Sequence, residues 1–378
     1  MSLLAARAEA AEVAIPSAAR QVEVHGFVSP GAILTTKNNW LARSKKGSFE
    51  FTEVGLNFTV PLTERLRTGV QLFARDLGPF DNYTPRADWF YLDYRFDDWF
   101  GLRAGRVKIP FGLYNDSSDI DAARVPVLLP QSLYSVTNRD FLLAQTGAEV
   151  YGRVRGPGVG AFEYRIYAGT IFVDPATQST SRLAVSSIEV PYVVGQRLLW
   201  ETPLEGLRVG GSLQAIRLDM TSVVAPGTPG VPAGPLAIGV PGVLWVGSAE
   251  YVYRDLLLAA EYSRWTVRLD PPLPTVKSRV VSERAYVMGA YHVTSWLAPG
   301  LYYSLYFPDV DLRAGREHVQ HDIAATLRFD VNAHWIVKAE AHYMGGTAVL
   351  SERLNGDRPL STLEPSWGVF LLKTTAHF

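Results

Sequence analysis

The sequence contains no cysteine among its 378 residues. This absence excludes a disulfide scaffold, a thiolate metal site and a cysteine nucleophile. The chain also lacks any run of roughly 18–20 apolar residues, which a transmembrane helix requires, so a helical membrane bundle is excluded. The chain has no excess of basic residues either, because its 36 Lys and Arg are balanced by 37 Asp and Glu, which gives a net charge of -1. That balance argues against a nucleic-acid-binding protein.

What the sequence does contain is a repeated alternation of apolar and polar residues, which is the period-two pattern of β-strands. Within 49–60, for example, Val54, Leu56, Phe58 and Val60 fall on one face and polar residues fall on the other. The pattern predicts an all-β protein with about 16 strands. The predicted strands are Gln21–Leu34, Phe49–Val60, Leu66–Asp76, Ala87–Phe96, Trp99–Ile109, Leu142–Arg155, Gly160–Phe172, Val190–Trp200, Leu207–Met220, Gly242–Arg254, Asp255–Leu269, Glu283–Val293, Trp296–Phe307, Val319–Asp330, Ala333–Met344 and Ser366–Phe378.

The segments between the predicted strands alternate between short and long. Tight turns are expected at 61–65, 97–98, 155–159, 201–206, 254–255, 294–296 and 331–332. Longer loops are expected at 35–48, 77–86, 110–141, 173–189, 221–241, 270–282, 308–318 and 345–365. Short periplasmic turns and long extracellular loops are typical of transmembrane antiparallel β-barrels. We therefore predict a barrel of the Gram-negative outer membrane, with both chain ends on the periplasmic side.

Charged side chains gather on the face opposite to the apolar one. They are Glu53, Arg75, Asp93, Arg95, Glu149, Arg153, Glu163, Arg165, Arg197, Glu250, Glu261, Asp322, Arg328, Lys338, Glu340 and Lys373. Burying so many charges in a packed core costs several kcal/mol each unless every one is well paired. A water-filled lumen removes that cost, and about 16 strands enclose enough space for one. A soluble barrel with the charges outside is the alternative, but its interior would need an apolar filling wider than side chains supply.

The first twenty residues show only part of an export signal, the small residues from Ala8 to Ala11. We expect 1–20 to be an Ala-rich N-terminal segment on the periplasmic side, or a short helix before the first strand. Residues 21–378 are expected to form a single transmembrane β-barrel.

The predicted strand that leads into the longest loop ends in the run 105–112, which reads GRVKIPFG. Pro110 ends a strand ladder, and Gly112 permits a sharp inward turn. This run resembles a pattern of the phosphate-selective porin family and its general-porin relatives, in which basic residues precede Pro-Phe-Gly at a loop entrance. The final residue, Phe378, resembles the assembly signal of outer-membrane barrels. The resemblance implies a homotrimer surrounded by outer-membrane lipid, with a channel for small hydrophilic solutes or ions.

In general porins with this layout the third long loop folds into the lumen and narrows it, so the resemblance makes 110–141 a candidate constriction loop. Its charged residues would then help to set the ion preference. The alternative is an outer loop whose charges are solvated. The charged residues of this segment are Asp116, Asp119, Asp121, Arg124, Arg139 and Asp140.

Basic residues on the neighbouring predicted strands extend the charged set. Arg106 and Lys108 share one face, but Asp93, Glu149 and Glu163 interleave with the basic residues, which argues against phosphate selectivity and favours a lumen of opposed charges. The predicted pore and constriction residues are Arg75, Arg95, Arg106, Lys108, Asp116, Asp119, Asp121, Arg124, Glu149, Arg153, Glu163 and Arg165.

Catalytic and metal-binding motifs are missing from the sequence, including GxSxG, HExxH and the Walker loop. His318 and His321 are three residues apart, which places them on opposite faces of a strand. We therefore expect no catalytic residue, no metal and no cofactor. Three hypotheses follow: a passive channel, a barrel that serves as a partner or scaffold in an envelope complex, and a barrel enzyme. Ion conductance separates the first from the other two.

Overall fold

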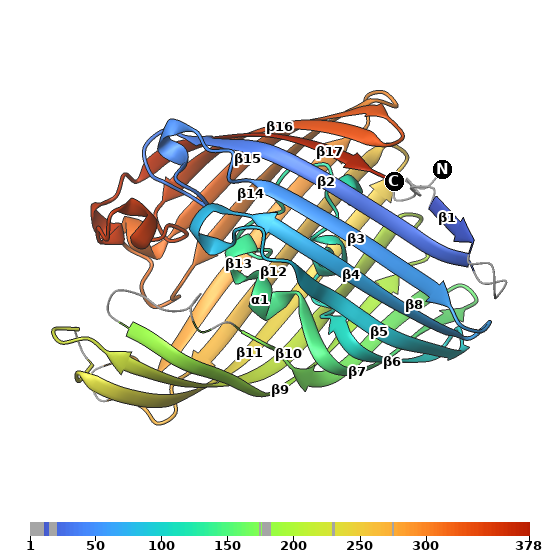
Figure 1. Cartoon of the computed structure of the whole chain (residues 1–378). Coiled ribbons are helices and arrows are strands. Elements are labelled where there is room, and N and C mark those ends of the chain that lie inside the picture. Colours follow the sequence, from blue (N-terminus) through green and yellow to red (C-terminus); the bar gives the residue numbers. More distant parts are fainter. Residues whose placement is uncertain (1–10, 15–20, 174, 176–182, 229–230, 274–275) are drawn as a thin grey trace.

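In the computed structural model the chain forms a closed antiparallel β-barrel (Figure 1). The structure describes residues 11–14, 21–173, 175, 183–228, 231–273 and 276–378. Sixteen strands, β2 to β17, each pair with the next along the chain, and β17 pairs with β2 to close the ring. The prediction of a 16-strand barrel is therefore confirmed. One further strand, β1 (Ala11–Ala14), pairs with the beginning of β2, whereas the rest of the Ala-rich segment lies outside the described residues.

The barrel strands are β2 (Gln21–Thr35), β3 (Thr52–Pro61), β4 (Leu66–Asp76), β5 (Arg86–Asp97), β6 (Phe100–Lys108), β7 (Ala144–Gly156), β8 (Gly160–Thr170), β9 (Leu183–Glu201), β10 (Leu207–Val224), β11 (Gly234–Tyr253), β12 (Leu256–Arg268), β13 (Arg279–Tyr291), β14 (Leu297–Phe307), β15 (Gln320–Asn332), β16 (Trp335–Gly346) and β17 (Ser366–His377). One α-helical turn, α1 (Arg139–Leu142), is present in the described part. The 3-10 turns are Ser44–Lys46, Gly78–Phe80, Asn115–Ser117, Asp121–Ala123, Val136–Asn138, Arg316–His318, Arg353–Asn355 and Leu360–Thr362.

Several strands extend further into the long loops than the sequence predicts, most of all those that border two of these loops. β9 begins at Leu183, β10 ends at Val224 and β11 begins at Gly234, so the expected loops 173–189 and 221–241 are too long. The expected loop 221–241 is too long because its prolines, such as Pro235, argue against a strand. Residues 234–241 in fact pair with β10, but the ladder with β12 begins only at Gly242, so this part of β11 has one neighbour. A strand with one neighbour tolerates proline, because the missing N–H is not needed on its free side.

The connections alternate between short and long, as predicted. The short ones are 62–65, 98–99, 157–159, 202–206, 254–255, 292–296 and 333–334. The start of β2 and the end of β17 lie at this same short-turn end of the barrel (Figure 1). No helix in the described part is long and apolar enough to cross a membrane.

The two faces of the strands divide as the alternation predicts. On the terminal strand β17, Phe370 and Leu372 are about half exposed on the outside, while Leu371 and Lys373 are buried inside. Apolar residues of the other strands also face outward, and together they form an apolar belt around the barrel. A belt of this kind is typical of barrels that face lipid. Its members include Leu72, Leu92, Ile166, Leu198, Leu213, Val243, Leu258, Val287, Leu301, Ile323 and Leu327.

The interior of the barrel is not an open tube. The segment 109–143 between β6 and β7, called loop 3 from here on, lies inside the ring of strands (Figure 1). Its apolar side chains, such as Ile109 and Leu133, form one buried cluster with wall residues that include Val193, Leu244 and Tyr286. Loop 3 therefore narrows the lumen at this level.

Candidate functional site

Loop 3 turns inward directly after β6. Gly112 has a φ of +57°, in the left-handed region that favours glycine, and a Cβ at this position would lie 2.4 Å from the Tyr134 hydroxyl. The backbone N–H of Gly112 donates a hydrogen bond to Ser212 on β10 at 3.1 Å. Glycine is therefore required where the chain leaves the wall and crosses toward the opposite side of the barrel.

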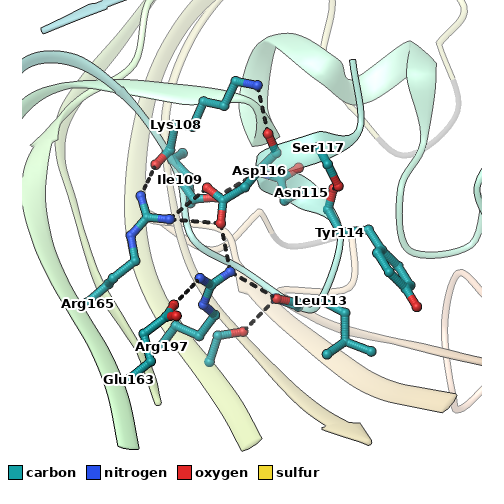
Figure 2. A network of polar contacts seen from close by, with 12 residues as sticks. Lys108, Ile109, Leu113, Tyr114, Asn115, Asp116, Ser117, Glu163, Arg165 and Arg197 are labelled. Carbon is teal, nitrogen blue, oxygen red and sulfur yellow. Dashed lines mark hydrogen bonds and ion pairs between the residues drawn. The ribbon is translucent and has the colours of Figure 1, made fainter. Parts of the chain in front are cut away.

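Asp116 of loop 3 is clamped between two arginines of the wall (Figure 2). Its carboxylate accepts hydrogen bonds from Arg165 on β8 at 2.7 and 2.8 Å and from Arg197 on β9 at 2.8 Å. The Lys108 ammonium donates to the main-chain carbonyl of Asp116 at 2.7 Å. Burial alone would raise the pKa of the Asp116 carboxyl, but the two guanidinium groups outweigh it and hold that pKa well below its usual range.

The ion pairs continue around the barrel as a chain of alternating charge. Arg165 also contacts Glu149 at 2.6 Å, and Glu149 contacts Arg103 at 3.2 Å. Arg103 in turn contacts Asp93 at 3.2 Å, and Asp93 contacts Arg67 at 2.8 Å. Each step crosses to the next strand, from β8 back to β4. We call this group the charged wall; its members are Arg67, Asp93, Arg103, Glu149, Glu163, Arg165 and Arg197.

Asp119 anchors loop 3 a few residues further on. Its carboxylate accepts hydrogen bonds from Lys108 at 2.6 Å and from the Gln71 amide at 2.8 Å. Asp88 on β5 pairs with Arg139, the first residue of α1, at 2.7 Å. Burial opposes ionisation of Asp119, yet the attraction of Lys108 and Arg139 lowers its pKa overall.

Asp121 attaches loop 3 to the strands next to the barrel closure. The Lys338 ammonium lies 3.1 Å from its carboxylate, and the Thr375 hydroxyl donates to it at 2.7 Å. Burial would raise the pKa of Asp121, but Lys338 and Lys373 outweigh that effect and lower it. Glu340 on β16 accepts the backbone N–H of Val127 at 2.7 Å, which fixes the following part of the loop.

The opposite side of the barrel holds loop 3 by neutral groups. Glu261 on β12 accepts hydrogen bonds from the hydroxyls of Tyr134, Tyr286 and Ser248 and from the Leu113 backbone N–H at 2.9 Å. Among the described residues no basic side chain forms an ion pair with this carboxylate. The surrounding side chains are apolar or aromatic. We call this side the tyrosine wall; its members are Leu244, Val246, Glu261, Tyr286, Met288 and Tyr302.

Two cavities border loop 3. The narrow cavity, about 40 Å³, lies between loop 3 and strands β3 and β4 and has room for about one to three water molecules. Charged groups of both signs line it: Glu53, Arg75, Asp119, Arg124 and Arg139. The second cavity, about 700 Å³, lies on the short-turn side of the loop and is called the vestibule. Arg124 and Leu129 line both cavities, so the two spaces adjoin there.

The predicted site residues do not form one cluster in the structure. Arg75, Asp119 and Arg124 line the narrow cavity. The residues that join the Asp116 cluster are Lys108, Asp116, Glu149, Glu163 and Arg165. Asp121 binds Lys338, and Arg106 donates to the carbonyl of Asp88 at 2.8 Å. Arg95 and Arg153 lie apart from the rest near the short turns, paired with Asp98 and Glu201.

Sequence reasoning did not place Glu53, Lys338 or Glu261 at the site, although all three were recognised on the charged face. Their role depends on loop 3 reaching them, for which the sequence carries no local signal. The side chain of Asp140 lies outside the described part of the chain. Within the described ranges, no group of three or more His, Asp or Glu is arranged to hold a metal ion.

The comparisons with known proteins concern the fold. No family model matches the sequence, and no curated protein matches it. Outer-membrane expressed OmpT of Vibrio cholerae has a TM-score of 0.63 at 12% identity, with 96% of this chain and 99% of that chain covered. An anion-selective porin from Comamonas acidovorans has a TM-score of 0.59 at 12% identity, with 95% and 100% covered. OmpF of Salmonella typhi in complex with daunomycin has a TM-score of 0.57 at 14% identity, with 95% and 98% covered. The chain therefore has the fold of bacterial outer-membrane porins.

Proposed function

We propose that this barrel is a channel of the bacterial outer membrane through which small hydrophilic solutes or ions diffuse passively. The apolar outer belt suits a lipid environment, and the short turns then face the periplasm. A matched structure of OmpT is described as a trimer form, which supports a homotrimer here as well. The proposal assigns no catalytic role to any residue.

The observation that carries this proposal is the lining of the narrow cavity by opposed charges. Arg75, Arg124 and Arg139 contribute three positive groups, and Glu53 and Asp119 contribute two negative ones. Charged side chains at the narrowest point of a channel set its ion preference. Each of these arginines also pairs with a carboxylate just outside the lining, Arg75 with Asp81, Arg124 with Asp121 and Arg139 with Asp88. The charges therefore nearly balance, and we propose only a weak ion preference.

The small size of the narrow cavity limits what passes in this conformation. A space of about 40 Å³ admits water or a small ion in single file rather than a sugar or an amino acid. Passage of a larger solute through this space would require a shift of loop 3. We therefore propose a narrow, ion-conducting pore rather than a wide one.

Single-channel conductance of the refolded protein in a planar bilayer, with reversal potentials measured under a salt gradient, tests the proposal. We expect discrete steps with a weak ion preference. Arg75→Gln should shift the reversal potential toward cations, and Glu53→Gln should shift it toward anions. Arg153→Gln, whose side chain lies near a short turn, is the matched control and should leave the potential unchanged.

A folded barrel that never conducts would sink the channel proposal and would favour the partner or scaffold hypothesis. Equal shifts from Arg75→Gln and Arg153→Gln would remove the narrow cavity as the selectivity site. Retention of the barrel is checked by circular dichroism and by heat-modifiable migration in gels.

A further inference from the structure

The vestibule differs in character from the charged cavity on the other side of loop 3. It has a volume of about 700 Å³ and is enclosed by the short-turn ends of β2, β11, β12, β13, β15 and β17. Its inner end is formed by residues 120–126 and Leu129 of loop 3. His25, His292 and His377 lie among its lining residues at the short-turn end. Molecules therefore reach it from the side that the proposed orientation assigns to the periplasm.

Apolar side chains dominate the walls of the vestibule. Ala290 on β13 forms a small buried cluster with Val125 of loop 3, and Leu257 of β12 packs against it. Met288 and Leu129 belong to the larger buried cluster and also line the vestibule. Apolar walls do not stabilise a passing ion, because they provide no hydrogen bonds to replace the water that the ion loses. Ion conduction alone therefore does not explain this apolar surface.

Two charged side chains of the vestibule, Arg328 and Glu250, already have partners within the protein. Arg328 pairs with Asp330 at 2.7 Å and donates to the carbonyls of Ala122 and Arg124 at 2.8 and 3.0 Å. Glu250 accepts hydrogen bonds from Arg208 and from the Tyr114 hydroxyl, each at 2.7 Å. A charged ligand would therefore compete with these internal pairs, whereas an uncharged one leaves them intact.

We propose that the vestibule is a binding site for one small uncharged organic molecule with an apolar body. Pockets of about 300–1,000 Å³ with mostly apolar linings are typical of sites for such ligands. The apolar part would contact Val125, Leu257 and Ala290, and a hydroxyl or amide group would point toward the histidines at the rim. The site does not depend on loop 3 opening, so it goes beyond the proposed channel function.

Ligand-observed fluorine NMR with the full chain in lipid nanodiscs tests this inference. The probe is 4-fluorobenzyl alcohol, and its charged analogues 4-fluorobenzoate and 4-fluorobenzylammonium are measured beside it, with empty nanodiscs as the reference for partition into lipid. We expect saturable binding of the alcohol and at least about tenfold weaker binding of both ions, because an ion would lose its hydration and would have to compete with the internal ion pairs of Arg328 and Glu250.

Two substitutions should abolish or weaken this binding. Ala290→Phe places a ring at the apolar contacts of Val125 and Leu257 and should weaken binding of the alcohol about tenfold or more, since the displaced contacts are apolar. Val287→Phe is the matched control, because Val287 lies on the same strand but is 57% exposed on the outer face. Should Ala290→Phe fail to fold, Leu257→Glu places a charge on the apolar wall and carries the same expectation.

Three results would overturn the inference: no saturable binding beyond that of empty nanodiscs, equal binding of all three probes, or unchanged binding in the folded Ala290→Phe or Leu257→Glu variant. The outcome is separable from the channel test. Binding of the alcohol without conductance would support the vestibule site and contradict the proposed channel function. Conductance without binding would support the channel and contradict the vestibule site.

Discussion

The charged wall and the tyrosine wall hold the same loop by different physical means. On the charged wall, Asp116 and Asp119 are fixed by Arg165, Arg197 and Lys108. On the tyrosine wall, apolar packing is joined by neutral donors that converge on one carboxylate. One attachment depends on ionisation and the other depends on shape, so the two should respond differently to pH and to single substitutions.

The free energy of unfolding lost on removing one interaction should also be larger on the charged wall than on the tyrosine wall. Removal of one member of a buried ion pair costs about 3–5 kcal/mol, because it leaves an uncompensated charge in a place of low dielectric. Loss of one hydrogen bond to a carboxylate costs less, about 1.5–3 kcal/mol. Charges also produce a field that an ion feels at a distance, which a tyrosine does not. The charged wall is therefore where both the position of loop 3 and the ion preference are most easily changed.

Acidification should have the largest effect, because it acts on Asp116, Asp119 and Asp121 together. All three have a pKa below the usual value of a carboxyl in the folded protein. Their stabilising contribution is therefore complete above the unfolded pKa of about 4 and is lost as the pH falls through the lower folded values. We expect steady channel conductance from pH 8 to about pH 5, and unstable conductance with easier unfolding well below pH 4. A transition centred between pH 6 and 7 would contradict this and would implicate a group other than these three carboxylates.

Asp116→Asn should have the next largest effect. It removes the carboxylate shared by Arg165 and Arg197, and we expect a loss of about 2 kcal/mol in the free energy of unfolding, less than a fully buried pair because Asp116 is partly exposed. Loop 3 should also become more mobile. The chain has no cysteine, so the labelling rate of a single Ser118→Cys reports on the loop alone.

The matched control for Asp116→Asn is Glu163→Gln. Glu163 contacts Arg197 at 2.8 Å, but it belongs to β8 and does not hold the loop. Faster labelling of the Ser118→Cys reporter is expected with Asp116→Asn and not with Glu163→Gln. Equal labelling rates in the two variants would show that the cluster acts through total charge rather than through its grip on loop 3.

Tyr134→Phe tests the tyrosine wall and should have a smaller effect. It removes one donor to Glu261 and also the acceptor of the Tyr114 backbone N–H at 3.1 Å, while Tyr286, Ser248 and the Leu113 N–H still donate to the carboxylate. We expect a loss of about 1.5 kcal/mol in denaturant unfolding, at the low end for a bond to a carboxylate because three donors remain, and an unchanged labelling rate at Ser118→Cys. A labelling rate as high as that of Asp116→Asn would remove the distinction between the two walls.

The sequence predicts the faces of the strands well, because side-chain alternation is a local property. Phe370 and Leu372 face outward and Lys373 faces inward for no reason beyond their spacing along an extended chain. The inward turn at Gly112 is also a local feature, because a residue without a Cβ can adopt the positive φ that this turn requires. Proline content was a poor guide where β11 extends along a single neighbour.

The partners inside the barrel could not be predicted, because they depend on the path of loop 3. Asp116 lies 49 residues from Arg165, and Leu113 lies 148 residues from Glu261. Pairs so far apart in sequence are set by strand register and by packing of the whole loop. The same reasoning explains why the predicted set included two arginines that the structure places away from loop 3.

Those two arginines provide the smallest predicted effects. Arg95 pairs with Asp98 and Arg153 pairs with Glu201, and all four side chains are at least 39% exposed near the short turns. Exposed ion pairs contribute at most about 1 kcal/mol, and salt at physiological strength screens their field beyond about 8 Å. Arg95→Ala and Arg153→Ala should therefore change the free energy of unfolding by less than about 0.5 kcal/mol and leave the reversal potential where it is. A large shift in the reversal potential with Arg95→Ala would mean that ion preference is set at the periplasmic rim, before an ion meets either wall around loop 3.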